Sequence, residues 1–352
     1  METTINFQII RILFMTFLAF VIAIALTPAL AHFLYKFRLS KEIRNEGITP
    51  IYSRLHAPKA GTPTMGGILV WISVLILILL SAVLPKIFPS SEFFSRIDFL
   101  SRAETLLPLG ALIASAMVGF VDDIFNTRKI GASGGGLRIR HKILLYFLIA
   151  LFGAYWFYAK LDWTTIHVPF AGNFDIGIWY IPIFVFIIVS TAFSVNETDG
   201  LDGLAGGTLL AAFGAYGAIA FAQQRYDLAL FCAVIIGALL AFLWFNINPA
   251  RFFMGDTGSM SLGVTLGIIA MLTNSALFLP IIGLVFIIEA LSVIVQVISR
   301  KFFHRKVFLS APIHHHLEAR GWPEPKIVMR FWIVSAVTAV LGLVLAIMDF
   351  QR

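Results

Sequence analysis

Five aspartates lie in three short polar stretches that interrupt long apolar runs. "VGFVDDIFN" carries Asp122 and Asp123, "NETDGLDGLAGG" carries Asp199 and Asp202, and "NINPARFFMGDTGSMSLG" carries Asp256. Neighbouring carboxylates repel each other, so such a set needs a cation or hydrogen-bond donors nearby. Mg²⁺ takes hard oxygen ligands, usually one or two carboxylates, and leaves positions for phosphate oxygens. The pattern therefore predicts a site where a divalent cation holds a diphosphate.

Each aspartate taken alone also has an ordinary structural explanation. Asp-Gly and Asp-Thr-Gly are frequent turn and capping sequences, so Asp202 and Asp256 could each cap the helix that follows. The set as a whole favours one shared site, because loops expected on that face otherwise carry mostly Lys and Arg.

Basic residues and histidines follow in other polar stretches. "HAPKAGTPTMGG" offers Lys59 to a phosphate but lacks the spacing of a P-loop, and Lys142 follows a basic segment. "SAPIHHHLEARGW" holds three consecutive histidines, for which zinc is one explanation. Adjacent residues of a helix point about 100° apart. Phosphate or sugar binding therefore fits these histidines better than joint chelation of one ion.

The elements that carry these stretches are predicted to span a membrane. The chain has 352 residues, of which 59% are hydrophobic and 13% charged, whereas soluble domains average about 25% charged residues. Apolar runs near the ~20 residues that cross a bilayer recur throughout, and we expect the first to remain an uncleaved span. The predicted helices are 12–35, 66–84, 105–122, 142–159, 178–195, 204–222, 228–246, 258–274, 279–299 and 329–348. We therefore predict an all-α polytopic membrane protein with ten transmembrane helices and one domain over 1–352.

Charge and strand patterns orient this bundle. Of the 26 Lys and Arg residues, 18 fall in the loops after the odd-numbered spans and 7 on the opposite side. The positive-inside rule makes the odd-numbered loops cytoplasmic and both termini periplasmic. The outer stretch 162–177 alternates β-branched and polar residues around Ala171, which predicts a small periplasmic β-hairpin. A single cysteine, Cys232, excludes an intramolecular disulfide.

One acid, Glu289, falls inside a predicted span. Ser292 and Gln296 follow it at i+3 and i+7, so the three share a helix face. Exposing a carboxylate to lipid costs about 2.5–3.5 kcal/mol or more, so this face must point into the bundle. A structural and a functional role fit Glu289 equally well, and Gln296 is the better site candidate.

Taken together, these stretches resemble a known enzyme family. "VGFVDDIFN", "NETDGLDGLAGG", "NINPARFFMGDTGSMSLG" and "APIHHHLE" are similar to the polyprenyl-phosphate N-acetylhexosamine-1-phosphate transferases. "PTMGG" and "PIHHHLE" resemble the branch that acts on MurNAc-pentapeptide. The resemblance implies transfer of phospho-MurNAc-pentapeptide from UDP-MurNAc-pentapeptide to undecaprenyl phosphate, giving lipid I and UMP in the first membrane step of peptidoglycan synthesis. It implies Mg²⁺ as cofactor and the bacterial inner (plasma) membrane as location, with a cytoplasmic active site among membrane lipids. No nucleic-acid partner is expected, and the oligomeric state is left open, a homodimer included.

The resemblance also implies roles for individual residues. Asp256 is expected to bind Mg²⁺, with Asp122 and Asp123 as the catalytic pair. Asn196 and Asp199 are expected in the nucleotide-sugar pocket. The uridine site is expected to comprise Gly200, Leu201 and Asp202, with Phe253 stacked on uracil. The remaining substrate-binding candidates are Lys59, Thr64, Lys142, Asn246, Gly255, Ser259, Gln296, His314, His315 and His316.

Other function classes fit parts of the pattern. A secondary transporter places charged sites near the bilayer midplane on broken helices and in repeated halves, whereas these aspartates lie at span ends and no repeat is visible. A sister transferase that uses UDP-GlcNAc is disfavoured by the "PIHHHLE" stretch. A non-catalytic scaffold would not need clustered acids.

Overall fold

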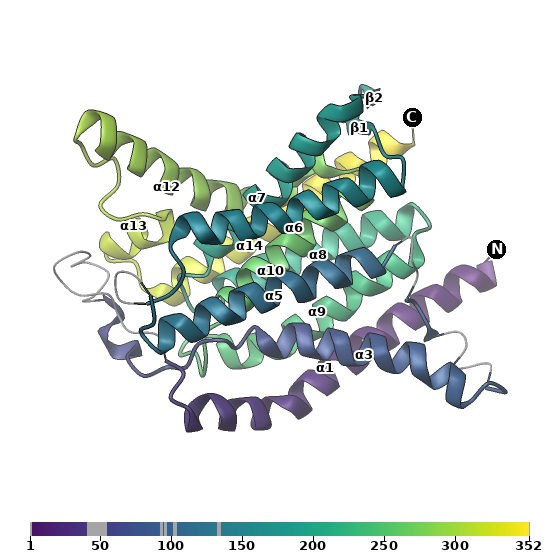
Figure 1. Cartoon of the computed structure of the whole chain (residues 1–352), viewed down its shortest axis with the longest axis horizontal. Helices are drawn as coiled ribbons and strands as arrows, with labels where there is room; N and C mark the ends of the chain where they lie inside the picture. The colour runs from purple at the N-terminus through teal and green to yellow at the C-terminus, as the bar shows by residue number, and fades with distance from the viewer. Residues whose placement is uncertain are drawn as a thin grey trace.

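Helices make up most of the structure, which is a computed structural model (Figure 1). It describes residues 2–40, 55–91, 94, 97–100, 104–131 and 135–351. Within that part of the chain, eight helices are long and apolar enough to cross a membrane. They are α1 (Glu2–Lys36), α3 (Ile68–Ile87), α5 (Leu106–Thr127), α6 (Ile139–Lys160), α7 (Tyr180–Thr198), α8 (Leu204–Ala222), α9 (Tyr226–Asn246) and α14 (Glu324–Phe350). Six basic residues of the charge comparison lie outside the described residues: Lys41, Arg44, Arg54, Arg96, Arg102 and Arg352.

A ninth candidate span is broken. The short segment of η4 (Ala276–Phe278) and α11 (Leu279–Ile282) meets α12 (Leu284–Phe303) at a bend of 83°. The prediction of one continuous helix over 279–299 is therefore wrong. Gly283 lies at the break, and glycine is a weak helix former, so the chain turns there at low cost. Beyond the break, α12 leaves the bundle (Figure 1).

The predicted helix near 258–274 is α10 (Asp256–Leu272), and all 17 of its residues are buried. It is shorter than the eight long spans. The Ser261 hydroxyl donates to the Thr257 carbonyl at 2.6 Å, and the Thr265 hydroxyl donates to the Ser261 carbonyl at 2.8 Å. Because such hydroxyls are satisfied one turn back along their own helix, a segment rich in Ser and Thr can lie in the core. Helices α5 and α7 pack against it, and this contact brings their acidic ends to the beginning of α10.

The predicted hairpin is confirmed. Strands β1 (Thr165–Val168) and β2 (Gly172–Asp175) pair antiparallel, with Ile166 opposite Phe174. The hairpin lies at the same end of the molecule as both chain termini (Figure 1). It is tied to the end of α14, because Asp349 bonds the His167 ring at 2.5 Å and accepts the backbone N–H of Phe170 at 2.9 Å.

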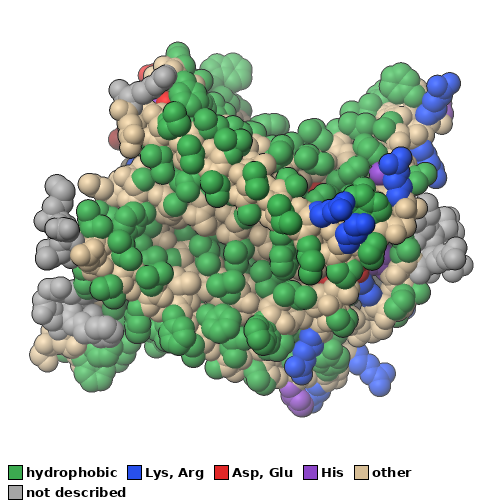
Figure 2. All heavy atoms as spheres, turned by 180° about the vertical axis from the view of Figure 1, so that it is seen from behind, with side chains coloured by type: hydrophobic (Ala, Val, Ile, Leu, Met, Phe, Trp, Pro, Cys, Tyr) green, Lys and Arg blue, Asp and Glu red, His purple; other side chains and the backbone are tan. Residues whose placement is uncertain are grey.

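The polar loops gather at the opposite end of the bundle. This end holds the short helix α13 (Ile313–Ala319), the turn η1 (Ala57–Lys59) and the first residues of α6, α8 and α10 (Figure 1). Figure 2 shows a broad hydrophobic face, with Lys and Arg side chains gathered toward this same end. The eight-to-nine-span helical architecture thus places all three acidic stretches at one basic end.

Candidate active site

The ammonium of Lys142 joins two of the acidic stretches. Lys142, in the first turn of α6, lies 2.5 Å from Asp122 Oδ2 on α5 and also bonds Asp256 Oδ2 at the first position of α10. Both aspartates are almost fully buried. One positive charge thus sits between two carboxylates that are 134 residues apart in the sequence.

Asp122 has donors on both of its oxygens. The backbone N–H of Leu137 donates to Oδ1 at 2.5 Å, and the Asn126 amide donates to Oδ2 at 3.0 Å. Together with Lys142, these donors hold the carboxylate in one orientation. Asn126 follows Asp122 by one helical turn, a relation that the helix period alone could have revealed.

Asp123 lies against the beginning of α10. Its Oδ2 accepts the backbone N–H of Thr257 at 3.0 Å, one of the orphan donors at a helix N-terminus, where negative charge is favoured. Gly255 precedes the helix with φ of +74°, and a Cβ there would lie 2.6 Å from Asp123 Oδ2 and 2.8 Å from Thr64 Oγ1. Only glycine fits, so Asp123 and Thr64 approach the backbone at this point.

The third acidic stretch joins the same cluster. The Asn196 amide donates to Asp256 Oδ1 at 3.1 Å and to Ser259 Oγ at 2.9 Å. Asp199 accepts the backbone N–H of Gly255 at 3.2 Å. The structure therefore brings together Asp122, Asp123, Asp256, Lys142, Thr64, Asn196, Asp199, Gly255 and Ser259.

Neither Asp202 nor Asp256 caps a helix. The N-cap residues of α8 and α10 are Gly203 and Gly255, which have no side chain that could cap, and Asn246 and Asp123 from other helices accept N–H groups at these two helix starts. Both carboxylates instead bond side chains from distant segments. The capping explanation, open from sequence, does not apply.

A second charged cluster surrounds Lys59. Its ammonium lies 2.7 Å from Asp202 Oδ1 and 2.5 Å from Glu324 Oε1, and 5.8 Å from the ring centroid of Phe253. Burial alone would lower the pKa of Lys59, but the charges and hydrogen bonds of Glu324 and Asp202 together raise it above its ordinary value. Asn248 donates to both carboxylates, at 3.0 and 3.2 Å. The sequence did not single out Glu324 or Asn248. Glu324 had one signal that could have drawn attention to it, since it lies between two prolines at the start of α14.

Two further candidates shape this second cluster. Asn246 accepts the backbone N–H of Gly203 at 3.0 Å and donates to the Phe252 carbonyl at 2.8 Å, so it joins the start of α8 to the loop before α10. Leu201 is buried against Ile327 and Val328 of α14. Asn246 thus fixes the residue before Phe253, and Leu201 anchors the chain immediately before Asp202, the partner of Lys59.

The three consecutive histidines have three different surroundings. His314 is fully buried, and its Nδ1 lies 2.9 Å from Glu289 Oε2. His315 lies 2.6 Å from Glu318 Oε2, and His316 accepts the backbone N–H of Leu309 at 3.1 Å. The three rings therefore do not converge on a single ion.

The bend before α12 explains the Glu289 contact. It directs this helix toward α13 and brings the carboxylate to His314. Gln296, on the same face, bonds the backbone of Val307 and Phe308 at 3.0 to 3.1 Å through both ends of its amide. Gln296 thus holds the loop before α13. Its hydrogen bonds within the described residues go to that loop and not to the aspartate cluster.

Burial and neighbouring charges set the pKa values of the histidines and of Glu318 in α13. Burial lowers the pKa of His314, but the Glu289 carboxylate outweighs it and the net shift is upward. The pKa of His315 falls to about 3, through burial and the charge of His314. Burial raises the pKa of Glu318, yet bonds to His315 and His56 bring it down to about 2. At neutral pH, His315 is a neutral imidazole beside an ionised carboxylate.

Replacement of Gly200 by Ala is expected to destabilise the protein by roughly 1–3 kcal/mol. A Cβ at Gly200 would lie 2.1 Å from His314 Nε2, and the ring cannot retreat easily because Glu289 holds its other side. Thermal unfolding in detergent measures the loss. Gly214→Ala, inside α8 with no atom within 4 Å of the added Cβ, is the matched control and should not lower the melting temperature. A melting temperature for Gly200→Ala that equals or exceeds the control's would contradict the close contact.

Comparisons with known proteins bear on the same residues. The model of Glycosyl transferase family 4 matches residues 105–274, and the Phospho-N-acetylmuramoyl-pentapeptide-transferase signature 1 matches residues 59–69. The Phospho-N-acetylmuramoyl-pentapeptide-transferase of Anoxybacillus flavithermus is 40% identical over 333 residues, which cover 94% of this chain and 97% of that protein. The chain belongs to the phospho-N-acetylmuramoyl-pentapeptide-transferase family. Relatives of the same name in a Geobacillus species and in Chloroflexus aggregans are 39% and 37% identical, over 93% and 96% of this chain and 95% and 90% of theirs.

Membership of the phospho-N-acetylmuramoyl-pentapeptide-transferase family confirms the resemblance seen in the motifs. The family-model match contains Asp122, Asp123, Asn196, Asp199 and Asp256, and the signature match contains Lys59 and Thr64. These residues are the ones that the structure gathers at one end. Glu324 and α13 lie outside both matched ranges, so only the tertiary structure connects them with the site.

Proposed function

We propose that this protein transfers phospho-MurNAc-pentapeptide from UDP-MurNAc-pentapeptide to a polyprenyl phosphate, undecaprenyl phosphate, with release of UMP and formation of lipid I. One observation carries the proposal: buried Asp122 and Asp256 meet at Lys142, and buried Asp123 bonds the start of α10 beside them. The family that the chain belongs to supports the same substrates. Attack of one phosphate on another brings two anions together, so positioned positive charge is the main catalytic need.

The aspartate cluster fits Mg²⁺. Lys142 already places a cation between Asp122 and Asp256, so the site accommodates positive charge there. All the acidic donors are carboxylate oxygens, which Mg²⁺ prefers. We assign Asp256 as the ligand, with Asp122 and Asp123 close by. When bound, Mg²⁺ supplies charge that neutralises the diphosphate.

The chain's own residues have distinct roles in this proposal. Lys142 and the positive end of the α10 helix dipole attract phosphate oxygens, and Asn196, Asp199 and Ser259 orient the donor around Asp256. The cluster of Lys59, Thr64, Gly200, Leu201, Asp202, Asn246 and Phe253 forms the uridine end, and Gly255 gives close backbone access. His314, His315, His316 and Gln296 shape the far wall through α13 and its preceding loop. Every residue assigned here belongs to one chain, so a homodimer would carry two such sites.

The proposal includes an orientation in the bacterial inner membrane. We propose one domain over 1–352 with ten crossings, in which α10 and the broken α11–α12 pair supplement the eight long helices. α10 is enclosed by other helices, so its length of about 25 Å suffices for the core. The basic end with the acidic cluster then faces the cytoplasm, and the hairpin and both termini face the periplasm.

Cysteine accessibility tests this orientation. In a Cys232→Ala background, Lys306→Cys, in the exposed loop between α12 and α13, should resist a membrane-impermeant thiol reagent in intact cells and react after permeabilisation. Ala171→Cys, at the exposed hairpin turn, is the control and should react in intact cells. Labelling of Lys306→Cys from outside would reverse the proposed orientation.

Release of UMP tests the function directly. Purified protein with undecaprenyl phosphate should release UMP from UDP-MurNAc-pentapeptide in the presence of Mg²⁺, and not from UDP-GlcNAc. Efficient use of UDP-GlcNAc would establish the sister transferase. Uptake of labelled nucleotide into proteoliposomes without UMP release would establish a transporter.

A further inference from the structure

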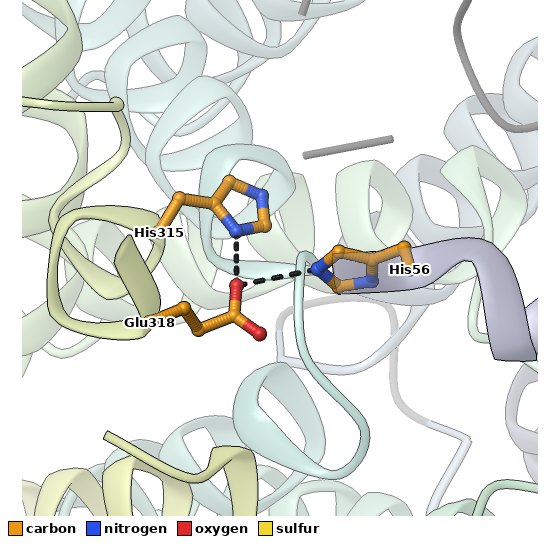
Figure 3. Close-up of side chains that lie close together, drawn as sticks. All are labelled: His56, His315 and Glu318. Atoms are coloured by element: carbon orange, nitrogen blue, oxygen red, sulfur yellow. Dashed lines mark hydrogen bonds and ion pairs between the residues drawn. The ribbon is translucent and has the colours of Figure 1, made fainter. Parts of the chain in front are cut away.

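Three buried side chains converge beside the candidate active site (Figure 3). One possible ligand atom each of His56, His315 and Glu318 lies within 4.8 Å of the other two. Glu318 Oε2 lies 2.6 Å from His315 and 3.2 Å from His56, and each of the three residues is less than 9% exposed. His56 comes from the first loop, more than 250 residues from the other two in the sequence. The two ring planes are nearly perpendicular, at 86°.

The donor types are those of a transition-metal site. Two imidazoles and one carboxylate are the three protein ligands of one well-known class of zinc site, which keeps a fourth position for water or substrate. Zinc–nitrogen and zinc–oxygen bonds of about 2.1 Å at tetrahedral angles place neighbouring ligand atoms about 3.4 Å apart. Glu318 Oε2 lies 2.6 and 3.2 Å from the two histidine nitrogens, closer than this value, and the two nitrogens are at most 4.8 Å apart, so side-chain movements of about 1 Å suffice. Imidazole suits zinc, copper or nickel, whereas Mg²⁺ prefers oxygen.

We propose that His56, His315 and Glu318 bind a zinc-class divalent cation that fastens the first loop to α13. The site is separate from the aspartate cluster in donor type and in the residues that form it. His56 immediately precedes η1, which ends at Lys59, so the bound cation fixes the position of Lys59 beside Asp202 and Glu324. Zinc binding thereby couples α13, which carries His315 and Glu318, to the second charged cluster around Lys59.

Metal analysis of purified protein tests the proposal. The protein should carry no polyhistidine tag. Bound metal is removed with a chelator, and the protein is then titrated with Zn²⁺ in the presence of excess, millimolar Mg²⁺. We expect one Zn²⁺ per chain, a higher melting temperature on binding, and visible absorption when Co²⁺ replaces Zn²⁺. Absence of Zn²⁺ and Co²⁺ binding by the unmodified protein would overturn the proposal without reference to transfer activity.

Two variants separate a metal site from a hydrogen-bonded triad. Glu318→Gln keeps an oxygen that can accept from both histidines but removes the charge, and should weaken Zn²⁺ binding by roughly 100-fold or more, because loss of an outer-shell partner alone costs about 10–100-fold. His304→Asn, at the exposed end of α12, is the matched control and should bind as the unmodified protein does. Equal Zn²⁺ affinity in Glu318→Gln and the control would show that zinc binds elsewhere. If Glu318→Gln fails to fold, the Co²⁺ spectrum of the unmodified protein decides, because four-coordinate protein-bound Co²⁺ absorbs strongly in the visible whereas six-coordinate hydrated Co²⁺ absorbs weakly.

Discussion

Asp256→Asn is expected to lower UMP release by roughly 10³-fold or more at every Mg²⁺ concentration, while the protein stays folded. The carboxylate lies in contact with Lys142 and Asn196 and is the proposed Mg²⁺ ligand. A bound metal contributes several kcal/mol of charge stabilisation, and each 1.4 kcal/mol is about tenfold in rate. Lys142 keeps Asp122 as a partner in the variant, so no buried charge is left alone.

Steady-state UMP release across a Mg²⁺ series, together with melting temperatures, measures this effect. Asp175→Asn, on the exposed face of β2 at the opposite end, is the control and should turn over normally. Normal turnover by folded Asp256→Asn would falsify the assignment of the ligand. Full recovery at high Mg²⁺ would instead show that Asp256 contributes only to affinity.

Labelled UMP is expected not to exchange into UDP-MurNAc-pentapeptide until undecaprenyl phosphate is added. In the direct route, an oxygen of the lipid phosphate attacks the β-phosphorus, and the bond to UMP breaks. A phosphomonoester has a second pKa near 6, so at neutral pH the lipid phosphate is largely dianionic and already nucleophilic. In the alternative route, an aspartate attacks first and forms a phospho-enzyme, which would exchange UMP without lipid.

The geometry of the aspartate pair favours direct attack. Asp122 accepts bonds from Lys142, Asn126 and Leu137, and Asp123 accepts one from Thr257. Donors on these oxygens reduce their nucleophilicity but suit carboxylates that orient charged groups. General-base help from either aspartate is then worth about 10²–10⁴-fold.

The exchange experiment needs protein rigorously freed of polyprenyl phosphate. Undecaprenyl phosphate added back to the same preparation is the positive control. Lipid-independent exchange that disappears in Asp122→Asn or Asp123→Asn would establish the covalent route and exclude direct attack.

Much of the architecture could be predicted from local sequence because hydropathy and periodicity are local properties. Apolar runs near the span length predicted the long helices, and alternation around Ala171 predicted β1 and β2. Charge asymmetry assigned three acidic stretches to one face, and the structure brings Asp122, Asp123, Asn196 and Asp256 together there. Topology predicts the shared face, because helix ends on one side of a membrane lie at the same depth, and packing then brings them into contact.

Contacts between side chains from distant segments depend on how the helices pack, so they cannot be predicted from a local sequence pattern. The break at Gly283 turned the predicted mid-span Glu289 toward His314, and the three histidines separated to different partners.

By itself, the sequence determined which segments are apolar helices and which residue types reach the basic end. The tertiary structure alone decided which residues meet there: Lys142 between Asp122 and Asp256, and Lys59 between Asp202 and Glu324. The physical reason is that hydropathy is a property of a segment, whereas a buried charge is stable only when a particular partner reaches it.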